Sequence, residues 1–326
     1  MLKTMKIIGT GSAVPSKSVS NEMLTGFLNT SDEWISTRTG IRTRRILTNE
    51  KLEDLAVEAT RAALESAKIS PDDVDFFICS NVSNNYVTPS LSAIVQEAVG
   101  SHAPCIDLNG ACAGFIYSLD FADAYLQTDR AKNILILCAE EPTRFCDWHQ
   151  RETSVLFGDG AGAVVVTKGD GLQSLHLTAS PDKDVIYYRR RLENTPYEHR
   201  GVDVDEPLVM QGREVFRMAV ESSQKDLDIV MTKAGVTSEQ VDYFLLHQAN
   251  MRIIKAIREQ IKQPEEKFPT NIERYGNTSS ASIPILLDEL SREGKLKDGA
   301  ILALSAFGAG FVTGAAVMKW STINYD

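Results

Sequence analysis

The sequence repeats part of itself, and this repeat constrains the fold more than any other feature. Residues 67–79 read AKISPDDVDFFIC and residues 234–246 read AGVTSEQVDYFLL, so one pattern of helix end, acidic turn and apolar strand occurs twice. A second pair, GAVVV from Gly162 and GAAVM from Gly314, follows in the same order. One such match can arise by chance, because turns between helices and strands converge on similar residues. Two matches in the same order favour a duplicated α/β fold.

Strand-like and helix-like segments alternate along the whole chain, which is typical of an α/β protein. We expect buried strands in the apolar runs at residues 6–8, 76–80, 134–139, 161–167, 243–246, 301–305 and 314–319. Helix-period segments lie between them at residues 55–67, 114–126, 214–234 and 251–261. The two halves would be residues 1–170 and 171–326, and residues 180–207 would form a long surface loop or insertion.

Composition and charge exclude several classes of protein. The 326 residues are 43% apolar and 24% charged, as in globular proteins, and the net charge of −10 argues against general nucleic-acid binding, although a local basic patch remains open. The five cysteines include no CxxC pair, which suggests free thiols in a reducing compartment. The N-terminus has no signal-peptide pattern and no stretch approaches a membrane span, so we expect a cytoplasmic protein. No metal cluster or nucleotide-phosphate loop is evident, and we expect no bound cofactor.

Cys112 is a candidate nucleophile. It lies in DLNGACAG, among small residues and directly before the amphipathic segment that starts at Phe115. At a helix start, unpaired N–H groups and the helix dipole favour a thiolate, so we expect a lowered thiol pKa there. A buried structural cysteine is the alternative, and it is the better interpretation for Cys79, Cys105 and Cys138.

Three further segments offer groups that could complete a site with Cys112. His247 follows the strand at residues 243–246, Asn277 begins a cluster of small polar residues, and Phe307–Gly308–Ala309–Gly310 forms a glycine-rich turn. Each feature alone also fits a structural role, as a core histidine, a helix cap or a tight turn. Together they would supply a nucleophile, two neutral donors and backbone N–H groups for an oxyanion.

These motifs resemble the ketoacyl-acyl-carrier-protein synthase III family of the thiolase superfamily. The resemblance rests on TSDEWISTRTGI from Thr30, GACAG around Cys112, FGDGAGAVVV from Phe157, HQAN from His247, GNTSSAS from Gly276 and AFGAG from Ala306. It spans residues 5–320 and implies a thiolase fold, with five layers α-β-α-β-α from two duplicated halves, and a homodimer. It implies no cofactor beyond the coenzyme A thioester that serves as substrate.

The resemblance also implies a mechanism that initiates fatty acid synthesis. Cys112 would take an acyl group from acyl-CoA, and malonyl-acyl-carrier protein would then lose carbon dioxide to give an enolate held by His247 and Asn277. The enolate would attack the acyl group and yield a 3-ketoacyl-acyl-carrier protein. The N–H groups of Cys112 and Ala309 would form the oxyanion hole, and Phe307 would exclude water.

The same resemblance assigns residues that bind the two substrates. For coenzyme A they are an adenine clamp of Trp34 and Arg38, Arg151 beside it, and tunnel residues Gly212, Phe216, Ala249 and Asn250. A basic patch for the acidic carrier protein would comprise Arg217, Arg252 and Arg258.

The chain departs from the family pattern at a few positions. Ala309 replaces a glycine, Thr313 stands where relatives carry a bulky tryptophan, and Glu259 stands where relatives tend to be basic. Thr88 replaces an aromatic residue that closes the acyl pocket in relatives with short primers, so we expect room for more than an acetyl group. Three other interpretations are a relative with a different acyl acceptor, a cysteine hydrolase and a non-catalytic binding module for carrier protein. The last two are disfavoured by the duplication and by the presence of Cys112.

Overall fold

Two β-sheets form the centre of the molecule in the computed structural model, which describes residues 5–189, 196–197 and 207–325. The first sheet has the strand order β1-β7-β6-β4-β5, with bounds Lys6–Ala13, Gly160–Thr167, Asn133–Glu140, Phe76–Ser80 and Cys105–Leu108. The second has the order β11-β12-β13-β8, with bounds Tyr243–Leu246, Ile301–Gly308, Gly310–Lys319 and Leu172–Asp182.

Four strands of the first sheet match the four strands of the second, and β5 is the additional strand. β1 pairs antiparallel with β7, β7 antiparallel with β6, and β6 parallel with β4. In the second sheet β8 pairs antiparallel with β13, β13 antiparallel with β12, and β12 parallel with β11. The repeated sequence segments therefore occupy equivalent places, β4 with β11 and β7 with β13. The duplication expected from the sequence is present in the fold.

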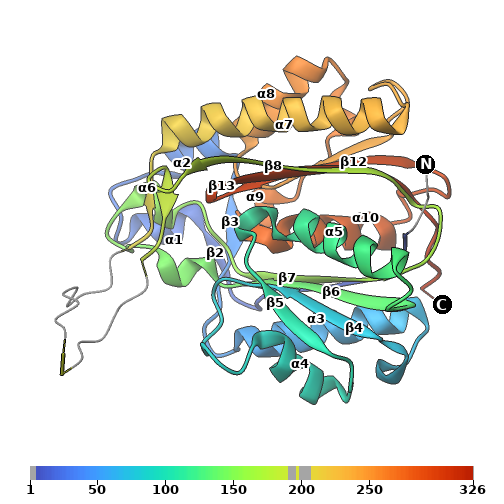
Figure 1. Ribbon diagram of the computed structural model, residues 1–326. Helices are drawn as coiled ribbons and strands as arrows, with labels where there is room; N and C mark the ends of the chain where they lie inside the picture. Colours follow the sequence, from blue (N-terminus) through green and yellow to red (C-terminus); the bar gives the residue numbers. More distant parts are fainter. Residues whose placement is uncertain (1–4, 190–195, 198–206, 326) are drawn as a thin grey trace.

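Helices cover and separate the sheets to give five layers, as Figure 1 shows. α5 and α10 lie between the two sheets, α3 and α4 cover the outer face of the first sheet, and α7 and α8 cover the second. These helices are α5 (Gly114–Gln127), α10 (Ser282–Arg292), α3 (Leu52–Ala67), α4 (Leu91–Val99), α7 (Gly212–Ala234) and α8 (Met251–Ile261). The α-β-α-β-α architecture is thus confirmed.

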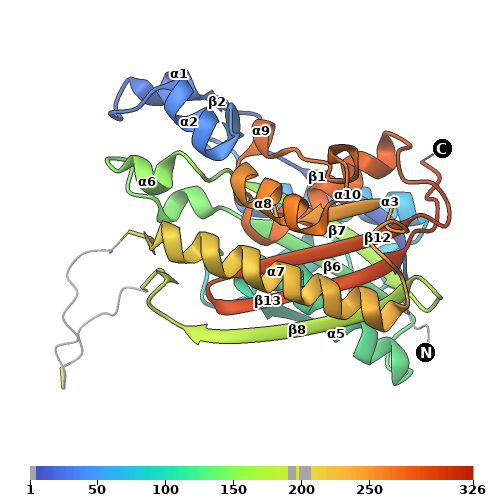
Figure 2. The ribbon, with the colours of Figure 1, turned by 90° about the horizontal axis from the view of Figure 1, so that it is seen from above.

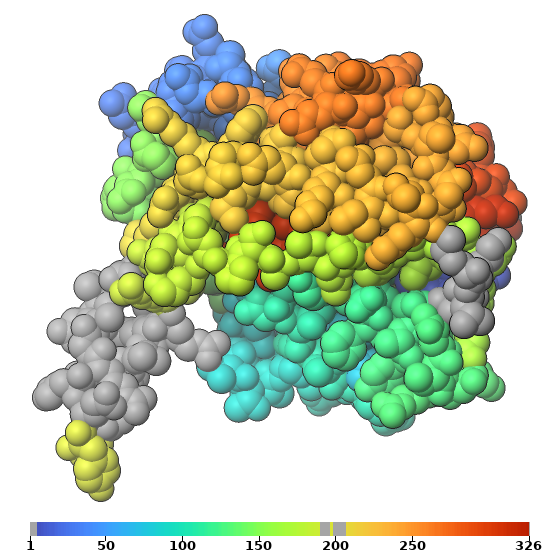
Figure 3. Space-filling view, turned by 45° about the horizontal axis from the view of Figure 1, so that its top comes forward, coloured from blue at the N-terminus to red at the C-terminus, as the bar shows by residue number. Residues whose placement is uncertain are grey.

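The apolar pattern of each element explains its layer. β6 and β7 are buried along nearly their whole length because helices lie on both faces of their sheet. α7 instead has one apolar side, with buried Val215, Leu227 and Val230 facing the second sheet. In Figure 3 a small window of dark red atoms opens between α7 and β8, so the helix covers much of this sheet.

The shorter elements gather near one end of α7, as Figure 2 shows for α1, α2 and α6. Ser20 and Ser31 cap α1 and α2, whose first-turn N–H groups need acceptors. The short helices are α1 (Asn21–Thr25), α2 (Asp32–Thr39), α6 (Arg151–Ser154) and α9 (Ile272–Tyr275). The short strands are β2 (Ser18–Ser20), β3 (Thr43–Arg45), β9 (Ile186–Tyr187) and β10 (Val209–Met210).

The strands and helices expected from the sequence are present, but several bounds differ and some elements, α4 among them, were not predicted. β1 runs to Ala13 and not to residue 8, because Gly9 and Gly11 in its second part pack closely against α3 and the polar Thr10 and Ser12 bond Asp288 on α10, which dilutes the apolar signal. β5 and β8 were not predicted as strands. β8 and β9 enter the expected surface loop at residues 180–207, of which residues 190–195 and 198–206 lie outside the described residues.

No helix in the described part of the chain is long and apolar enough to span a bilayer.

Candidate active site

A cavity of about 1340 Å³ collects groups from both halves of the chain. Cys112, His247 and Asn277 all line it, so the structure brings the three predicted catalytic residues to one site. They come from the segment after β5, the end of β11 and the turn before α10. The site thus combines a turn from the first half of the chain with two segments from the second half.

Cys112 lies in a single 3-10 turn, η2 (Ala111–Ala113), that leads directly into α5. Gly114 is the first residue of α5, and a Cβ atom there would lie 1.9 Å from Ser80 Oγ at the end of β4. The glycine therefore lets the helix begin against the sheet. Ala111 has a φ of 45°, in the left-handed region, which turns the chain sharply before the cysteine.

The expected lowering of the Cys112 pKa is wrong for the free protein. Burial raises the pKa of the thiol to about 11, and the negative charge of Glu140 adds to the rise. A hydrogen bond between Cys112 Sγ and Ser279 Oγ, 3.4 Å apart, acts in the opposite direction but does not offset the desolvation. The cysteine therefore rests as a thiol near neutral pH and must lose a proton before it attacks.

His247 is fixed at the C-terminal end of β11. Its backbone N–H donates to the backbone carbonyl of Ser305 at 2.9 Å, and its ring Nδ1 lies 2.7 Å from Ser282 Oγ. Nε2 is thus the ring nitrogen left for a ligand. Burial lowers the pKa of the imidazole to about 3, so the ring is neutral at physiological pH.

Asn277 is held so that its amide can donate. Its N–H donates to the Leu156 carbonyl at 2.8 Å, and its own carbonyl accepts from Gly158 at 3.1 Å. The side-chain Oδ1 accepts from the N–H of Ser279 at 2.9 Å, which leaves the amide NH₂ for a ligand. Gly276 must be glycine because its φ is 70° and a Cβ would lie 2.9 Å from the Leu156 carbonyl.

The turn between β12 and β13 closes against the cysteine. A Cβ on Gly308 would lie 2.7 Å from the backbone nitrogen of Cys112, so only glycine permits this approach. Ala309 lines the cavity and has no positive φ, so alanine fits this turn where relatives have glycine. Phe307 is buried, with its ring 5.3 Å from that of His247 and 5.8 Å from that of Phe311. Phe311 thus places an aromatic ring behind the site, although the tryptophan that the family resemblance led us to expect at position 313 is absent.

At the cavity mouth, two arginine guanidinium groups lie over the ring of Trp34. The guanidinium of Arg38 lies 4.6 Å from its ring centroid and that of Arg151 lies 4.3 Å from it. Trp34 and Arg38 line the cavity, whereas Arg151 does not line it and lies against Trp34. A flat base that stacks here would join or displace a guanidinium.

The predicted tunnel residues lie along one wall of the cavity. They are contributed by the start of α7 and the segment before α8, namely Gly212, Phe216, Ala249 and Asn250. Asn250 also caps α8, since its side chain accepts from the N–H of Arg252 at 2.9 Å. Thr88, by contrast, is exposed on the loop after β4 and is not part of this wall.

The predicted basic patch is only partly free. Arg252 lines the cavity mouth, with its guanidinium 5.7 Å from the Phe216 ring. Arg217 lies outside the cavity and pairs with Glu214 and Glu221 on its own helix, each at 2.9 Å. Arg258 pairs with Glu265. Within the described residues no group of histidine, cysteine and acidic side chains is arranged to hold a metal ion.

Several residues of the site were not predicted from the sequence. Ser279 and Ser282 appeared only as members of a small polar cluster, yet they contact Cys112 and His247. Arg213 lines the mouth of the cavity, and Glu140 lies behind Ser279. An acidic residue at the end of an otherwise apolar run was a usable signal for Glu140, because carboxylates are almost never fully buried without partners.

Known proteins with this sequence pattern share one family. Residues 106–181 match the family 3-oxoacyl-[acyl-carrier-protein (ACP)] synthase III, and residues 231–320 match its C-terminal family. The beta-ketoacyl-[acyl-carrier-protein] synthase III of Clostridium acetobutylicum is 39% identical and covers 98% of this chain and 100% of its own. That of Aquifex aeolicus is 42% identical over 97% of this chain and 99% of its own. The crystal structure of 3-oxoacyl-[acyl-carrier-protein] synthase III from Aquifex aeolicus VF5 superimposes with a TM-score of 0.91 at 39% identity, over 97% of this chain and 100% of that one. The chain therefore belongs to the 3-oxoacyl-[acyl-carrier-protein] synthase III family.

Proposed function

We propose that this protein is an acyltransferase that condenses an acyl-CoA primer with malonyl-acyl-carrier protein and so initiates fatty acid synthesis. The observation that carries the proposal is the meeting of Cys112, His247 and Asn277 in one cavity of a chain that belongs to this family. The cavity has room for a thioester arm and for the reacting groups at its end. A relative with a different acyl acceptor would use the same residues, but the relatives from Clostridium acetobutylicum and Aquifex aeolicus are named beta-ketoacyl-[acyl-carrier-protein] synthase III.

In the first half-reaction, Cys112 attacks the acyl-CoA carbonyl and coenzyme A leaves. The oxyanion formed during this attack would lie between the N–H groups of Cys112 and Ala309. The close approach of Gly308 to the Cys112 nitrogen supports this assignment, because Ala309 follows Gly308 directly and also lines the cavity beside Cys112. Donors that are fixed before the reaction stabilise such a charge most strongly.

In the second half-reaction, neutral donors hold the malonyl thioester carbonyl. We assign this role to His247 Nε2 and the Asn277 amide NH₂, since each has its other polar atom engaged by a serine. A neutral imidazole donates to the enolate oxygen without drawing the malonate carboxylate toward it. The buried ring of Phe307 keeps the site dry, which favours loss of carbon dioxide from an uncharged environment.

The cavity mouth suits coenzyme A. Trp34, with Arg38 and Arg151 beside its ring, offers a flat surface and positive charge for the adenine and its phosphates. Gly212, Phe216, Ala249 and Asn250 would line the pantetheine arm. Arg252, with Arg217 on the adjacent α7, would meet the acidic carrier protein at the same mouth. Arg213, which also lines the mouth, strengthens this patch.

We also propose a homodimer formed through the free edge of the first sheet. β5 is the edge strand, and Ile106 on it is 42% exposed, beside Val87 at 77% in the loop that follows β4. An uncovered edge with apolar side chains is a common dimer contact. We place the boundary of the duplicated halves between residues 170 and 171, in the turn between β7 and β8. The protein would act in the cytoplasm, where its five free cysteines stay reduced, with no cofactor beyond its thioester substrates.

The primer is expected to extend beyond acetyl because Thr88 replaces an aromatic residue. In the dimer this exposed loop would meet the partner subunit, so the missing bulk would enlarge the acyl pocket from outside the chain. Competition among CoA primers from acetyl to octanoyl tests this, and uptake of acetyl-CoA alone would contradict it.

The proposed function is tested by incubating the acylated protein with malonyl-acyl-carrier protein. Carbon dioxide release coupled to a 3-ketoacyl-acyl-carrier protein supports it. Transfer of the acyl group only to an alcohol or amine acceptor would favour the specialised relative instead.

A further inference from the structure

Glu140 is a fully buried carboxylate that the chemistry described so far does not use. It ends β6, and both of its oxygens accept hydrogen bonds. Oε2 accepts from the Val82 N–H at 3.2 Å and from the Ser83 hydroxyl at 3.1 Å. Oε1 accepts from the Ser280 hydroxyl at 2.8 Å and from the Ser279 hydroxyl at 3.3 Å. Four donors from two distant segments thus converge on one carboxylate.

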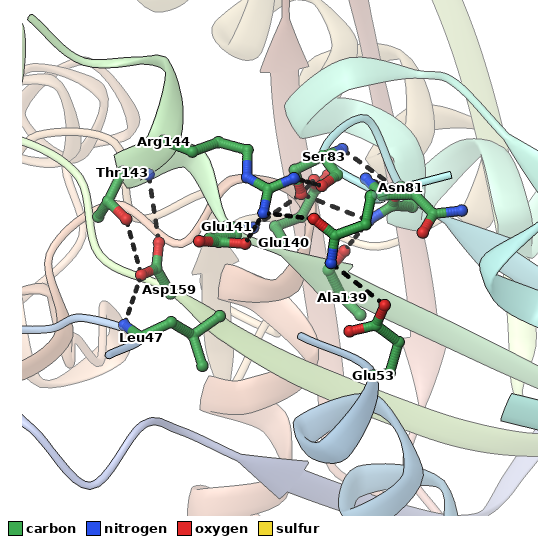
Figure 4. A network of polar contacts seen from close by, with 12 residues as sticks. Leu47, Glu53, Asn81, Ser83, Ala139, Glu140, Glu141, Thr143, Arg144 and Asp159 are labelled. Carbon is green, nitrogen blue, oxygen red and sulfur yellow. Dashed lines mark hydrogen bonds and ion pairs between the residues drawn. The ribbon is translucent and has the colours of Figure 1, made fainter. Parts of the chain in front are cut away.

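No cation balances this charge within the described residues. Arg144, close by in Figure 4, directs its guanidinium to the Ser83 carbonyl, to Asn85 and to Glu141. Asp159, the residue directly before the adjacent β7, is a second carboxylate; it accepts hydrogen bonds from the Leu47 N–H and the Thr143 hydroxyl. A buried carboxylate without a cation costs several kcal/mol, so a structural role alone explains it poorly.

The titratable groups that face Glu140 are three thiols. Cys79 lies on the adjacent β4, Cys138 lies on β6 itself and Cys112 lies on η2; the charge of Glu140 raises the pKa of each. From η5 (Ser279–Ala281) it receives only serine hydroxyls. Two of these thiols share a hydroxyl with Glu140, Cys112 through Ser279 and Cys138 through Ser280. Cys138 is fully buried, so of these two only Cys112 lines the cavity where a thioester can reach it.

Ser279 can serve the two groups in only one direction at a time, because its hydroxyl has one proton. While Glu140 is ionised, Ser279 donates to it and accepts from the Cys112 thiol. Once Glu140 is protonated, Ser279 is free to donate to a Cys112 thiolate. The direction of this hydroxyl therefore links the proton on the carboxyl to the proton on the sulfur.

We propose that Glu140, acting through Ser279, is the positioning residue that takes up the Cys112 thiol proton before acyl transfer. The proposal rests on the acyl transfer to Cys112 proposed above. The thiol proton passes from Sγ to Ser279 Oγ while the proton of Ser279 passes to Glu140 Oε1. The product is a thiolate and a neutral carboxylic acid, so the buried site carries one negative charge before and after the step.

The same proton is returned at the end of the cycle. The thiolate forms a bond to the acyl carbon, the carbon–sulfur bond to coenzyme A breaks, and the released coenzyme A thiolate takes a proton from solvent. Glu140 stays protonated beside the acyl-enzyme, so the malonyl enolate forms without a second charge nearby. When the new carbon–carbon bond breaks the thioester, the Cys112 thiolate regains its proton from Glu140 through Ser279.

The acid–base properties of the site agree with this route. Burial raises the pKa of Glu140 to about 7 and lowers the pKa of His247 to about 3. Glu140 is therefore the stronger base of the two in the free protein, while His247 is better suited to donate.

The test is the rate of acyl-Cys112 formation from acyl-CoA, followed by quenched intact-protein mass between pH 5.5 and 9.5. The variants are Glu140→Gln and Ser279→Ala, with Ser280→Ala as the matched control that contacts Glu140 but not Cys112. Wild type should level off above about pH 7. Glu140→Gln and Ser279→Ala should be slower by about 100-fold at neutral pH, within the range of general-base effects, and should keep rising with pH.

The outcomes are separable. Ser280→Ala should still level off, but at a higher pH, because the Ser280 hydroxyl lowers the pKa of Glu140. Equal losses in Ser279→Ala and Ser280→Ala across the whole pH range would indicate a structural role and overturn the proposal. Unchanged profiles in Glu140→Gln and Ser279→Ala would overturn it as well. If Glu140→Gln does not fold, Ser279→Ala decides. A wild type that takes up no acyl group from any acyl-CoA would instead contradict the proposed function itself.

Discussion

At the scale of single residues, burial controls the chemistry of this site. Cys112 stands at a helix start, which favours a thiolate, yet surrounding protein raises the pKa of the thiol to about 11. Burial destabilises the Cys112 thiolate more than the helix dipole stabilises it, because a dipole at a helix terminus contributes only about 0.3–1 kcal/mol near a surface. Sequence alone could place Cys112 at a helix start but could not show how deeply it is buried.

The two donors should separate the half-reactions. His247→Ala and Asn277→Ala each remove one neutral donor from the malonyl thioester while leaving Cys112 and its oxyanion hole in place. We expect the acyl adduct to form at near the wild-type level and condensation to fall by about 100-fold or more. Acyl adduct by intact mass and product from malonyl-acyl-carrier protein measure the two steps on one sample. Equal loss of both steps would argue against the assigned roles.

The free energy of unfolding should depend on the protonation of the buried Glu140 carboxyl. Its pKa is raised from 4.5 to about 7 in the folded protein, so the folded state binds this proton more tightly than the unfolded state. The stability of wild type relative to Glu140→Gln should therefore fall as pH rises from about 4.5 and level off above about 7, a change approaching 3 kcal/mol.

Urea unfolding of both proteins at pH 5, 6, 7 and 8 measures this difference. Asp159→Asn is a second probe, because burial also raises the pKa of Asp159 to about 7. A pH-independent difference between wild type and Glu140→Gln would show that Glu140 does not titrate in this range.

At the scale of elements, the glycine turn between β12 and β13 positions the oxyanion hole. Gly308→Ala introduces a Cβ at 2.7 Å from the Cys112 nitrogen, so the turn or η2 must shift. We expect acyl-adduct formation to fall by 10-fold or more, as about 1.4 kcal/mol of lost transition-state stabilisation would cause.

Gly26→Ala is the matched control, because its added Cβ would have only one neighbour, a carbonyl at 3.4 Å, and Gly26 has a right-handed helical conformation. Both variants should fold, as judged by circular dichroism. Normal acylation of Gly308→Ala would mean that the turn does not constrain the cysteine backbone.

Elements with a strong apolar period were predictable, and elements that depend on partners were not. β4, β11 and α8 have the expected bounds because their runs of apolar residues end sharply at polar ones. β5 was missed because, as an edge strand, it has an exposed Ile106 and no continuous apolar run. In β8, polar side chains such as His176 and Thr178 bond across to α7, so its burial depends on tertiary contacts.

At the scale of the whole molecule, duplication explains why the site exists where it does. Each half places a parallel strand pair with its ends toward the centre, and the central helices α5 and α10 begin beside those ends. Cys112 precedes α5 and Asn277 precedes α10 by a few residues, so equivalent turns supply the nucleophile and a donor. The repeat in the sequence indicated the duplication, but the equivalence of these two turns and the orientations of Ser279, Ser282 and Arg151 required the structure.

The proposed dimer can be tested at the β5 edge. Ile106→Lys places a charge on the exposed apolar edge and should shift the protein to a monomer in sedimentation velocity. Met23→Lys, a similar change at a side chain that is 47% exposed on α1, should leave the oligomeric state unchanged. A dimer that persists in Ile106→Lys would place the interface elsewhere.

The central claim is that Cys112 carries the acyl group, and intact-protein mass measures it directly. Wild type and Cys112→Ser are mixed with a panel of acyl-CoAs and then with malonyl-acyl-carrier protein. We predict one acyl adduct per wild-type chain, none on Cys112→Ser, and loss of the adduct as ketoacyl product appears. An adduct on Cys112→Ser, or no adduct on wild type with any acyl-CoA, would contradict the account.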